Sequence, residues 1–213
     1  VRGCAVSMPF KEACIEHLDG LHESAATLQS VNTIVADDGR LTGYNTDYSA
    51  VVSLLGKHGV PNDTRYALRG SGGMAKAVAC ALRDSGFASG CIVARNQAAG
   101  RALAEQCGVQ WREALGDEPA ELLVNVTPLG MRGAEADQLA FDEKAVAAAR
   151  WVFDVVAVPV ETPLIRLARS LGKPVITGGE VIVLQAVEQF VLYTGVRPDD
   201  ELIERAARFA LGE

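Results

Sequence analysis

Between residues 65 and 177, short apolar runs alternate with longer segments of mixed polarity. Runs such as Tyr66–Leu68 and Leu122–Asn125 predict strands, and the segments that follow them predict helices. This alternation is typical of a parallel, doubly wound sheet in an α/β fold. The predicted strands are 66–68, 89–94, 122–125, 151–156 and 174–177, and the predicted helices are 75–85, 97–107, 145–149 and 163–171.

The residues before this alternation follow a different pattern. Gln29–Asp37 and Leu41–Tyr44 predict the two strands of a hairpin, with Asp38-Gly39 as its turn. Upstream, Ala5–Met8 predicts a short strand that is followed by a polar helical stretch from Lys11. This part of the chain therefore predicts a second, smaller α/β substructure.

A helix is expected over 47–58, with Thr46 or Asn45 as its N-terminal cap. Four apolar residues are expected to form the buried face of this helix: Val51, Val52, Leu54 and Leu55. Two further helices, 181–194 and 199–211, are expected to close the chain.

These elements divide the chain into three predicted segments. Residues 1–58 form part of a first domain, residues 59–177 form the doubly wound domain, and residues 178–213 form helices that pack back on the first domain. Because the chain opens on a loop and a strand rather than on a methionine, further residues are expected upstream of Val1.

The composition makes several classes of partner improbable. The formal net charge is −7, the sequence pI is about 5.1, and no run of Lys or Arg occurs, which argues against nucleic acid. The most apolar stretch, Val181–Tyr193, is interrupted by Gln185, Glu188 and Gln189, which argues against a membrane span. No signal peptide pattern is present.

Five scattered cysteines without a CxxC pair indicate buried, reduced thiols and a cytoplasmic protein. Cys14, His17 and His22 are candidate metal ligands, but without a partner cluster they favour a protein that has no metal.

The segment Gly70-Ser71-Gly72-Gly73-Met74-Ala75 lies between a predicted strand and a predicted helix. It has the G-x-G-x-x-A form of the dinucleotide fingerprint. Gly70 permits the tight turn, Gly72 allows the backbone to approach a pyrophosphate, and Ala75 allows close packing of helix and strand. The free amides of the helix N-terminus would bind the phosphates. A plain glycine-rich loop is the alternative.

The end of the next strand distinguishes the two nicotinamide cofactors. NAD sites carry Asp or Glu there, whereas this chain has Val93-Ala94-Arg95-Asn96-Gln97, with no acid and one arginine. A guanidinium suits a 2′-phosphate because it offers several donors and a fixed charge. The sequence therefore favours NADP, with Arg95 as the phosphate ligand and Arg101 as a possible helper. An ordinary solvated arginine is the alternative.

Several short motifs, spread over nearly the whole chain, resemble those of the shikimate/quinate dehydrogenase family. The resemblance is to a divergent, shikimate 5-dehydrogenase-like branch. The matching segments, besides Gly70–Ala75 and Arg95-Asn96, are Ser7-Met8-Pro9-Phe10-Lys11, Val31-Asn32-Thr33, Asn45-Thr46-Asp47, Asn125-Val126-Thr127-Pro128-Leu129-Gly130-Met131 and the late Gln185.

This resemblance implies that Lys11 and Asp47 form a catalytic pair. It also implies that Ser7, Asn32 and Gln185 bind the substrate, and that Asn125 and Thr127 join the glycine turn in binding the cofactor. The chemistry of the residues agrees, because a lysine beside a carboxylate can move the proton of an alcohol while hydride leaves its carbon. A simple surface ion pair is the alternative reading of Lys11 and Asp47.

The family also implies a Rossmann domain, reversible oxidation of a shikimate-like polyol acid, and a monomer or homodimer acting in aromatic amino acid biosynthesis. Three features depart from its pattern: the Ser-x-Ser segment would precede Val1, Ala157 replaces a tyrosine, and Val181 replaces a methionine. Alternative functions are a quinate or aminoshikimate dehydrogenase, a non-catalytic NADP-binding regulator, and a folate-type dehydrogenase. Asn45-Thr46-Asp47 argues against the last.

Overall fold

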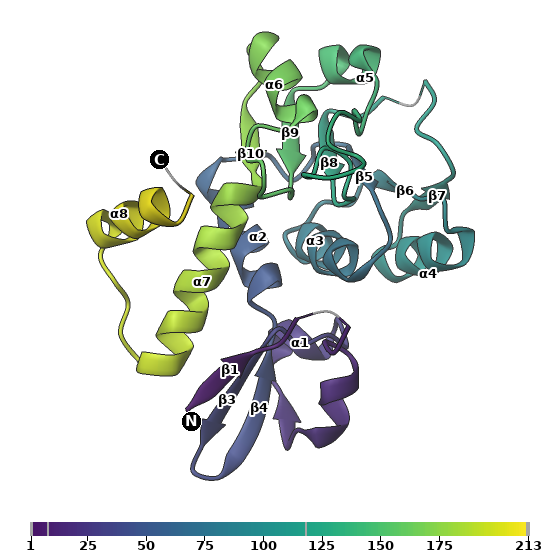
Figure 1. Ribbon diagram of the computed structural model, residues 1–213. Coiled ribbons are helices and arrows are strands. Elements are labelled where there is room, and N and C mark those ends of the chain that lie inside the picture. The colour runs from purple at the N-terminus through teal and green to yellow at the C-terminus, as the bar shows by residue number, and fades with distance from the viewer. Residues whose placement is uncertain (1, 8, 118, 212–213) are drawn as a thin grey trace. The chain divides into compact units, whose positions relative to one another are not determined.

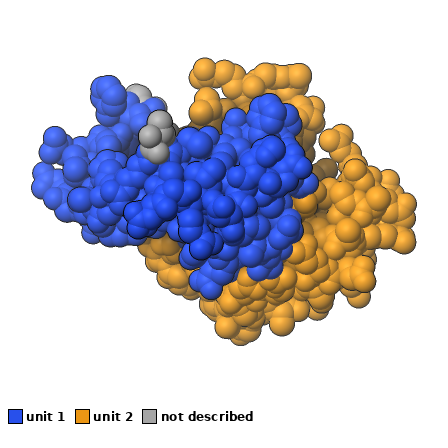
Figure 2. All heavy atoms as spheres, turned by 90° about the horizontal axis from the view of Figure 1, so that it is seen from below, with its two compact units in different colours: residues 1–51, 182–213 blue, residues 52–181 orange. Residues whose placement is uncertain are grey.

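A computed structural model describes residues 2–7, 9–117 and 119–211 of the chain (Figure 1). The chain divides into two compact units (Figure 2): residues 1–51 with 182–213 form unit 1, and residues 52–181 form unit 2. The predicted boundaries after residues 58 and 177 lie next to the end of helix α2 (Thr46–Lys57) and the start of helix α7 (Gly178–Thr194). The units divide within these two helices, so each helix contributes residues to both units.

Unit 2 contains the predicted doubly wound parallel sheet, and the α/β fold class is confirmed. All neighbouring strands of its six-stranded sheet are parallel, and the order is β10-β9-β8-β5-β6-β7. The strands are β5 (Tyr66–Arg69), β6 (Gly90–Val93), β7 (Gln110–Arg112), β8 (Leu122–Asn125), β9 (Trp151–Asp154) and β10 (Val175–Thr177).

Helices cover both faces of this sheet. In Figure 1, α3 (Gly73–Asp84) and α4 (Gln97–Cys107) lie on one face, and α5 (Glu143–Ala148) and α6 (Pro163–Ser170) lie on the other. On the second face, buried side chains of the strands pack with those of α5 and α6. This core includes Ala67, Leu123, Val152, Val146, Ile165 and Ala168. Strand β7 is absent from the predicted elements.

Unit 1 contains a four-stranded sheet with the order β1-β3-β4-β2. Its strands are β1 (Gly3–Ala5), β2 (Gly20–Leu21), β3 (Thr33–Asp37) and β4 (Arg40–Tyr44). The predicted hairpin is present, because β3 and β4 pair antiparallel across Asp38 and Gly39. Their φ angles of 46° and 80° suit a two-residue hairpin turn.

The first strands of unit 1 differ from their predicted positions. Strand β1 begins and ends earlier than the predicted strand Ala5–Met8, whose last residue lies outside the described part of the chain. The polar stretch after it forms the 3-10 helix η1 (Ala13–His17), and the short helix α1 (Glu23–Ala26) follows. Gln29 has a φ of 48°, so strand β3 begins only at Thr33.

Helix α2 begins with a side-chain cap. Asn45 Oδ1 accepts a hydrogen bond from the backbone N–H of Tyr48 at 3.1 Å, which identifies Asn45 rather than Thr46 as the cap. Val51, Leu54 and Leu55 are buried as predicted. Val52 is 37% exposed, so its placement on the buried face was wrong. Residues 51 and 52 are about 100° apart around a helix, and the apolar stripe does not extend that far.

The last part of the chain packs within unit 1. A Cβ atom built on Gly3 would lie 2.4 Å from the ring of Tyr193, so β1 and the second half of α7 are in close contact. Helix α8 (Asp200–Leu211) follows α7. None of the helices in the described ranges is long and apolar enough to cross a membrane.

The packing of unit 2 gives a stability prediction for two glycines. A Cβ on Gly90 would lie 2.6 Å from the ring of Tyr66, which is fully buried. We expect Gly90→Ala to lower the free energy of unfolding by about 1–3 kcal/mol, because the ring must shift within a filled core. Urea denaturation measures this change.

Gly56→Ala is the matched control in the same unit. A Cβ on Gly56 would meet no atom within 4 Å, and the residue lies in helix α2. We expect this substitution to be neutral or to stabilise unit 2 by about 0.5–1 kcal/mol, because alanine loses less backbone entropy in a helix. Equal stabilities of the two variants would contradict the packing argument.

Candidate active site

Unit 1 brings Lys11 and Asp47 into direct contact. Lys11 Nζ donates a hydrogen bond to Asp47 Oδ2 at 2.9 Å, although 36 positions separate the two residues. The Lys11 side chain is 26% exposed and that of Asp47 is 8% exposed. Asp47 lies in the first turn of α2, where the helix amides stabilise a carboxylate. The backbone of Lys11 is also held, because its carbonyl accepts from Val31 N at 2.8 Å.

Asn32 lies next to this pair through its contacts with Thr46. Asn32 Oδ1 accepts from Thr33 Oγ1 at 2.9 Å, from Thr46 N at 2.9 Å and from Thr46 Oγ1 at 3.2 Å. Within the described ranges, no acceptor is bonded to the Asn32 Nδ2 group. The amide therefore presents two N–H donors at a residue that is only 3% exposed.

Ser7 and Gln185 are the other predicted substrate ligands. Ser7 is exposed, and its carbonyl accepts from Phe10 N at 3.0 Å in the turn before Lys11. Gln185 is half-buried on α7, one turn before Gln189, and residues at this spacing share a helix face. All five residues predicted for catalysis and substrate binding thus belong to unit 1. A hydrogen bond joins Lys11 to Asp47, and Asn32 bonds to Thr46, the residue before Asp47.

The glycine turn follows β5 in unit 2 and leads into α3. Gly70 has a φ of 133°, a conformation that favours glycine. Gly72 is the N-terminal cap residue of α3, and Ala75 in its first turn is fully buried. Cβ atoms on Gly72 and Gly73 would meet nothing within 4 Å. This turn leaves open space beside its backbone, as a pyrophosphate requires, while Ser71 and Met74 are half-buried.

The loop after β8 lies directly beside this turn. A Cβ on Gly70 would lie 2.7 Å from Val126 Cγ2 and 3.3 Å from Thr127 Cγ2. Because β8 and β5 are neighbours and the chain order reverses between them, the two loops meet at the topological switch point of the sheet. Ligands of doubly wound sheets bind at such points, outside the carboxyl ends of the strands.

The Asn125 side chain is used entirely inside unit 2. Its Oδ1 accepts from Thr127 N at 3.0 Å and from Thr127 Oγ1 at 2.6 Å, and its Nδ2 donates to Leu129 O at 3.2 Å and Asp154 Oδ1 at 3.0 Å. These four bonds use the hydrogen-bonding capacity of the amide. The geometry therefore favours a loop-holding role for Asn125 rather than a side-chain contact with a ligand.

Asp154 is the buried carboxylate of the same network. Besides Asn125, it accepts from Val156 N at 3.1 Å and from Thr162 Oγ1 at 2.7 Å, and it is fully buried. Burial raises the pKa of Asp154 from its ordinary value of 3.8 to about 6, and the three hydrogen bonds oppose this rise.

Arg95 follows β6, at the same edge of the sheet as the glycine turn, and its side chain is exposed. Asn96 caps α4 by accepting from Ala99 N at 3.1 Å. Arg101 does not share this environment, because its guanidinium lies over the ring of Trp111 at 5.0 Å from the centroid. Of the two arginines, Arg95 is better placed to bind a phosphate.

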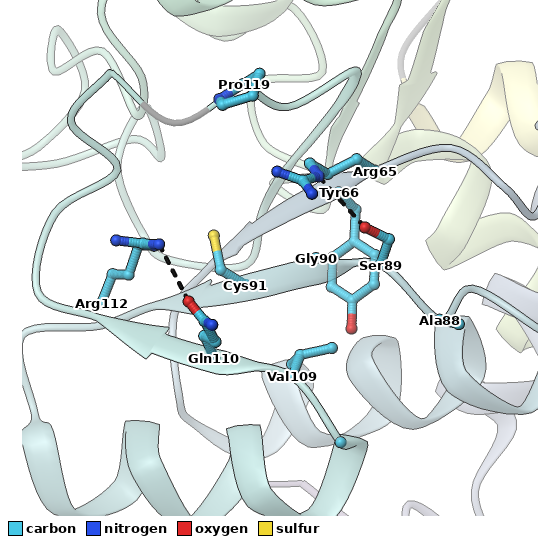
Figure 3. Close-up of a pocket in the computed structure, with 11 residues that line it drawn as sticks. Arg65, Tyr66, Ala88, Ser89, Gly90, Cys91, Val109, Gln110, Arg112 and Pro119 are labelled. Atoms are coloured by element: carbon cyan, nitrogen blue, oxygen red, sulfur yellow. Dashed lines mark hydrogen bonds between the residues drawn. The ribbon is translucent and has the colours of Figure 1, made fainter.

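A hollow of about 480 Å³ lies elsewhere in unit 2 (Figure 3). Its lining comes largely from the amino-terminal ends of β5, β6 and β7. Arg65 Nε donates to Ser89 Oγ at 3.3 Å there, and Arg112 Nη2 donates to Gln110 Oε1 at 3.1 Å. Because dinucleotides bind at the carboxyl ends of parallel strands, this hollow is not the candidate cofactor site.

The candidate metal ligands of unit 1 do not converge. His22 Nδ1 caps α1 by accepting from Ser24 N at 3.2 Å, and its ring stacks on Tyr44 at 4.9 Å. His17 is exposed and lies 3.5 Å from Glu16. Across the described ranges, no group of three or more His, Cys, Asp and Glu residues is arranged to hold a metal ion.

Comparison with known proteins identifies the family to which this chain belongs. A model of the shikimate dehydrogenase substrate binding domain matches residues 1–34. A shikimate dehydrogenase-like protein of Haemophilus influenzae is 52% identical over 211 residues, which cover 99% of this chain and 78% of that protein. The chain belongs to the shikimate dehydrogenase family.

Further members show the same similarity in sequence and in structure. A quinate/shikimate dehydrogenase (NAD(+)) of Corynebacterium efficiens is 35% identical, over 93% of this chain and 74% of that protein. The structure of a shikimate 5-dehydrogenase-like protein superimposes with a TM-score of 0.96 at 53% identity, covering 99% of this chain and 78% of the other. Shikimate 5-dehydrogenase of Thermus thermophilus, in complex with NADP(H) and shikimate, gives a TM-score of 0.87 at 33% identity, covering 99% and 79%.

Sequence reasoning missed the residues that hold the candidate residues of each unit in place. Gln189 Nε2 donates to Thr33 Oγ1 at 3.0 Å, and Thr162 and Asp154 anchor the loop after β8. The available signal for Gln189 was its spacing of four from Gln185. For Asp154 it was a lone acid at the end of an otherwise apolar strand.

The pKa of Asp154 gives a prediction about stability and pH. Between pH 3.8 and about 6 the folded state holds this proton more tightly than the unfolded state. Its contribution to the free energy of unfolding is therefore largest below pH 4 and declines as the pH rises to about 6. We expect the stability of the native chain, relative to Asp154→Asn, to fall by about 2 kcal/mol across this window.

Urea denaturation of both proteins at pH 4, 5, 6 and 7 measures this difference. Asp142→Asn is the control for removal of one carboxylate, because Asp142 is an exposed helix cap that accepts from Ala145 N at 2.8 Å. A stability difference between Asp154→Asn and the native chain that does not change with pH would contradict the prediction.

Proposed function

We propose that this protein is an NADP-dependent oxidoreductase that interconverts a secondary alcohol of a shikimate-like polyol acid and its ketone. The observation that carries the proposal is the 2.9 Å contact between Lys11 Nζ and Asp47 Oδ2. Relatives named shikimate dehydrogenase (NADP(+)) support it. In the proposal, unit 1 binds the substrate and unit 2 binds the cofactor.

In unit 2, the residues fit a dinucleotide. The open space at Gly72 and Gly73 admits a pyrophosphate against the amides of α3. Gly70, Ser71, Met74 and Thr127 form the rest of this surface, with buried Ala75 allowing close packing of α3 and Asn125 holding the loop. When bound there, the nicotinamide supplies the carbon that accepts or donates hydride.

Arg95 is the proposed ligand of the 2′-phosphate. It follows β6, where an NAD site has an acid, and the neighbouring positions 94, 96 and 97 are Ala, Asn and Gln. A relative that uses NAD(+) occurs in the family, so cofactor preference must be tested directly.

In unit 1, Lys11 is the proposed proton carrier. As an ammonium, its partly exposed Nζ can give a proton to the oxygen of a bound ketone, and as a neutral amine it can take the hydroxyl proton of a bound polyol. Asp47, which is nearly buried, fixes the direction of Nζ and balances its charge. Oxidation requires the substrate proton to pass to Lys11, and reduction requires Lys11 to return it. The proton is thus held at a defined atom in both directions.

Asn32, Gln185 and Ser7 are the proposed substrate ligands. The Asn32 amide offers donors to a substrate hydroxyl, because its oxygen is already occupied. Quinate is the second candidate substrate, on the strength of the quinate/shikimate dehydrogenase relative. Ala157 stands where the family has a tyrosine, so the hydroxyl contact of that tyrosine with the substrate is lost. The smaller side chain favours a pocket that tolerates altered ring substituents.

The direct test is an absorbance assay at the reduced-nicotinamide wavelength. The protein is mixed with NADP⁺, or with NAD⁺, and with shikimate, quinate or aminoshikimate in turn. Turnover of shikimate or quinate with NADP⁺ is expected. Cofactor binding without turnover of any polyol would instead favour a non-catalytic NADP-binding protein.

Removing the proton carrier should abolish most activity. We expect Lys11→Ala to lower kcat by roughly 10²- to 10⁴-fold, the range for loss of a general acid or base, with little change in cofactor affinity. Lys144→Ala is the matched control, since Lys144 also pairs with an aspartate, at 2.5 Å, but is exposed in unit 2. Steady-state kinetics measures kcat for both variants, and a native kcat in Lys11→Ala would refute the assignment.

Removing the phosphate ligand should change cofactor preference. We expect Arg95→Ala to weaken NADP⁺ binding by roughly ten- to a hundredfold, as for a charge-assisted hydrogen bond, and to leave NAD⁺ binding nearly unchanged. Arg101→Ala, which removes a guanidinium over Trp111, is expected to leave the ratio of the two affinities unchanged. Titration calorimetry measures both, and equal weakening of NADP⁺ and NAD⁺ by Arg95→Ala is the contrary result.

A further inference from the structure

A chain of hydrogen bonds runs through unit 1 from α7 to the Asn32 amide. Gln189 Nε2 donates to Thr33 Oγ1 at 3.0 Å, and Thr33 Oγ1 donates to Asn32 Oδ1 at 2.9 Å. Thr33 is fully buried and Gln189 is half-buried. A hydroxyl has one proton, so Thr33 can donate to Asn32 only if it accepts from Gln189. Gln189 therefore supplies a donor to Thr33 that leaves the proton of the hydroxyl for Asn32.

The same bonds decide which way the Asn32 amide faces. Its oxygen receives Thr33 Oγ1 together with the N–H and the hydroxyl of Thr46. If the amide were rotated by half a turn, its NH₂ group would face the N–H of Thr46, which can only donate. Burial makes such an unmatched donor costly, so one orientation is strongly preferred.

Gln189 also reaches the backbone at this point. Its Nε2 lies 3.5 Å from Asn32 O, which accepts a shorter bond of 2.8 Å from Val6 N. The Gln189 amide therefore contacts the side chain of Thr33 and the main chain of Asn32. The two residues are 156 positions apart in the sequence, but both belong to unit 1, so the contact lies within that unit.

We propose that Gln189 and Thr33 are positioning residues that hold the Asn32 amide with its NH₂ group available to the polyol. They set the affinity for the substrate without touching it. The proposal rests on the proposed function, in which Asn32 donates to a substrate hydroxyl. It assigns specificity to a residue of α7 other than the predicted ligand Gln185.

The first test is a double-mutant cycle of Gln189→Leu and Thr33→Val, assayed with NADP⁺ and the preferred polyol. Each single variant is expected to raise the KM for the polyol roughly five- to tenfold, as for one lost hydrogen bond, and to change kcat less than about twofold. The double variant should be no worse than the worse single variant, because both break one chain. Effects that multiply, or unchanged KM values, would overturn the proposal.

The second test reverses the direction of the chain. The carboxylate of Gln189→Glu has the shape of glutamine but no proton to donate, so the Thr33 hydroxyl turns toward it and leaves Asn32. We expect this variant to raise KM at least as much as Gln189→Leu. Thr33→Ser, which keeps the hydroxyl, should retain a nearly native KM. A native KM in Gln189→Glu would mean that Gln189 acts only by filling space.

Gln138→Glu is the matched control, because Gln138 is an exposed glutamine of unit 2. It should leave the KM unchanged. If Thr33→Val fails to fold, the two substitutions of half-buried Gln189 and the comparison with Thr33→Ser still decide the question.

A measurement without turnover separates this inference from the proposed function. The side-chain amide signals of Asn32 in a ¹⁵N–¹H spectrum are identified by their loss in Asn32→Asp. Gln189→Leu and Gln189→Glu are expected to shift them, whereas Gln138→Glu is not. If the native protein turns over no polyol, the proposed function fails. Asn32 signals that stay unshifted in both Gln189 variants overturn the positioning role.

Discussion

Asn32 Oδ1 is one acceptor atom that three donors share, and the arrangement of unit 1 depends on it. Thr33 and Thr46 both bond to it, so the start of β3 is fixed against the start of α2. Asp47 follows Thr46 and is therefore fixed as well, at the point where Lys11 Nζ reaches it. A buried amide that lost these partners would cost about 1–3 kcal/mol for each unsatisfied group. The need to satisfy one buried oxygen thus aligns three segments of the candidate site.

Unit 2 follows the same principle with Asp154 and Asn125. The carboxylate of Asp154 lies at the end of β9 and accepts bonds from three groups, one of which is the Asn125 amide at the end of β8. Burial raises its pKa to about 6, which shows that the charged form is held at some expense in free energy. Through Asn125, these bonds hold the loop that carries Thr127 beside the glycine turn. Both units therefore use a buried polar group to fix a loop at the edge of a sheet.

The elements that sequence reasoning placed well have strong local signals. Helix α4 runs from Gln97 to Cys107 as predicted, because Asn96 caps its start and Gly108, with a φ of 69°, ends it. Strand β8 is a fully buried apolar run. Strand β7 was missed because Gln110 and Arg112 flank Trp111 on an edge strand, where one face stays polar and three residues are too few to show an alternating apolar pattern. The start of β3 was misplaced because Gln29 has a φ of 48° and because Val31 N bonds to Lys11 O instead of to a neighbouring strand.

The candidate site shows the same division between local and distant signals. Lys11, Asn32 and Asp47 stand in short motifs, and each motif could be recognised without knowing the fold. Gln189 stands in no motif, and its spacing of four from Gln185 places it on the same helix face without indicating that its partner is Thr33, 156 positions away. The hydroxyl between them has a single proton, so the group at position 189 determines what Thr33 can offer to Asn32. A change from amide to carboxylate on α7 would thus alter the chemistry of a substrate ligand while every residue of the recognisable motifs stayed the same. Motifs can therefore identify the residues that meet the substrate, but the direction in which those residues donate and accept is set by the fold.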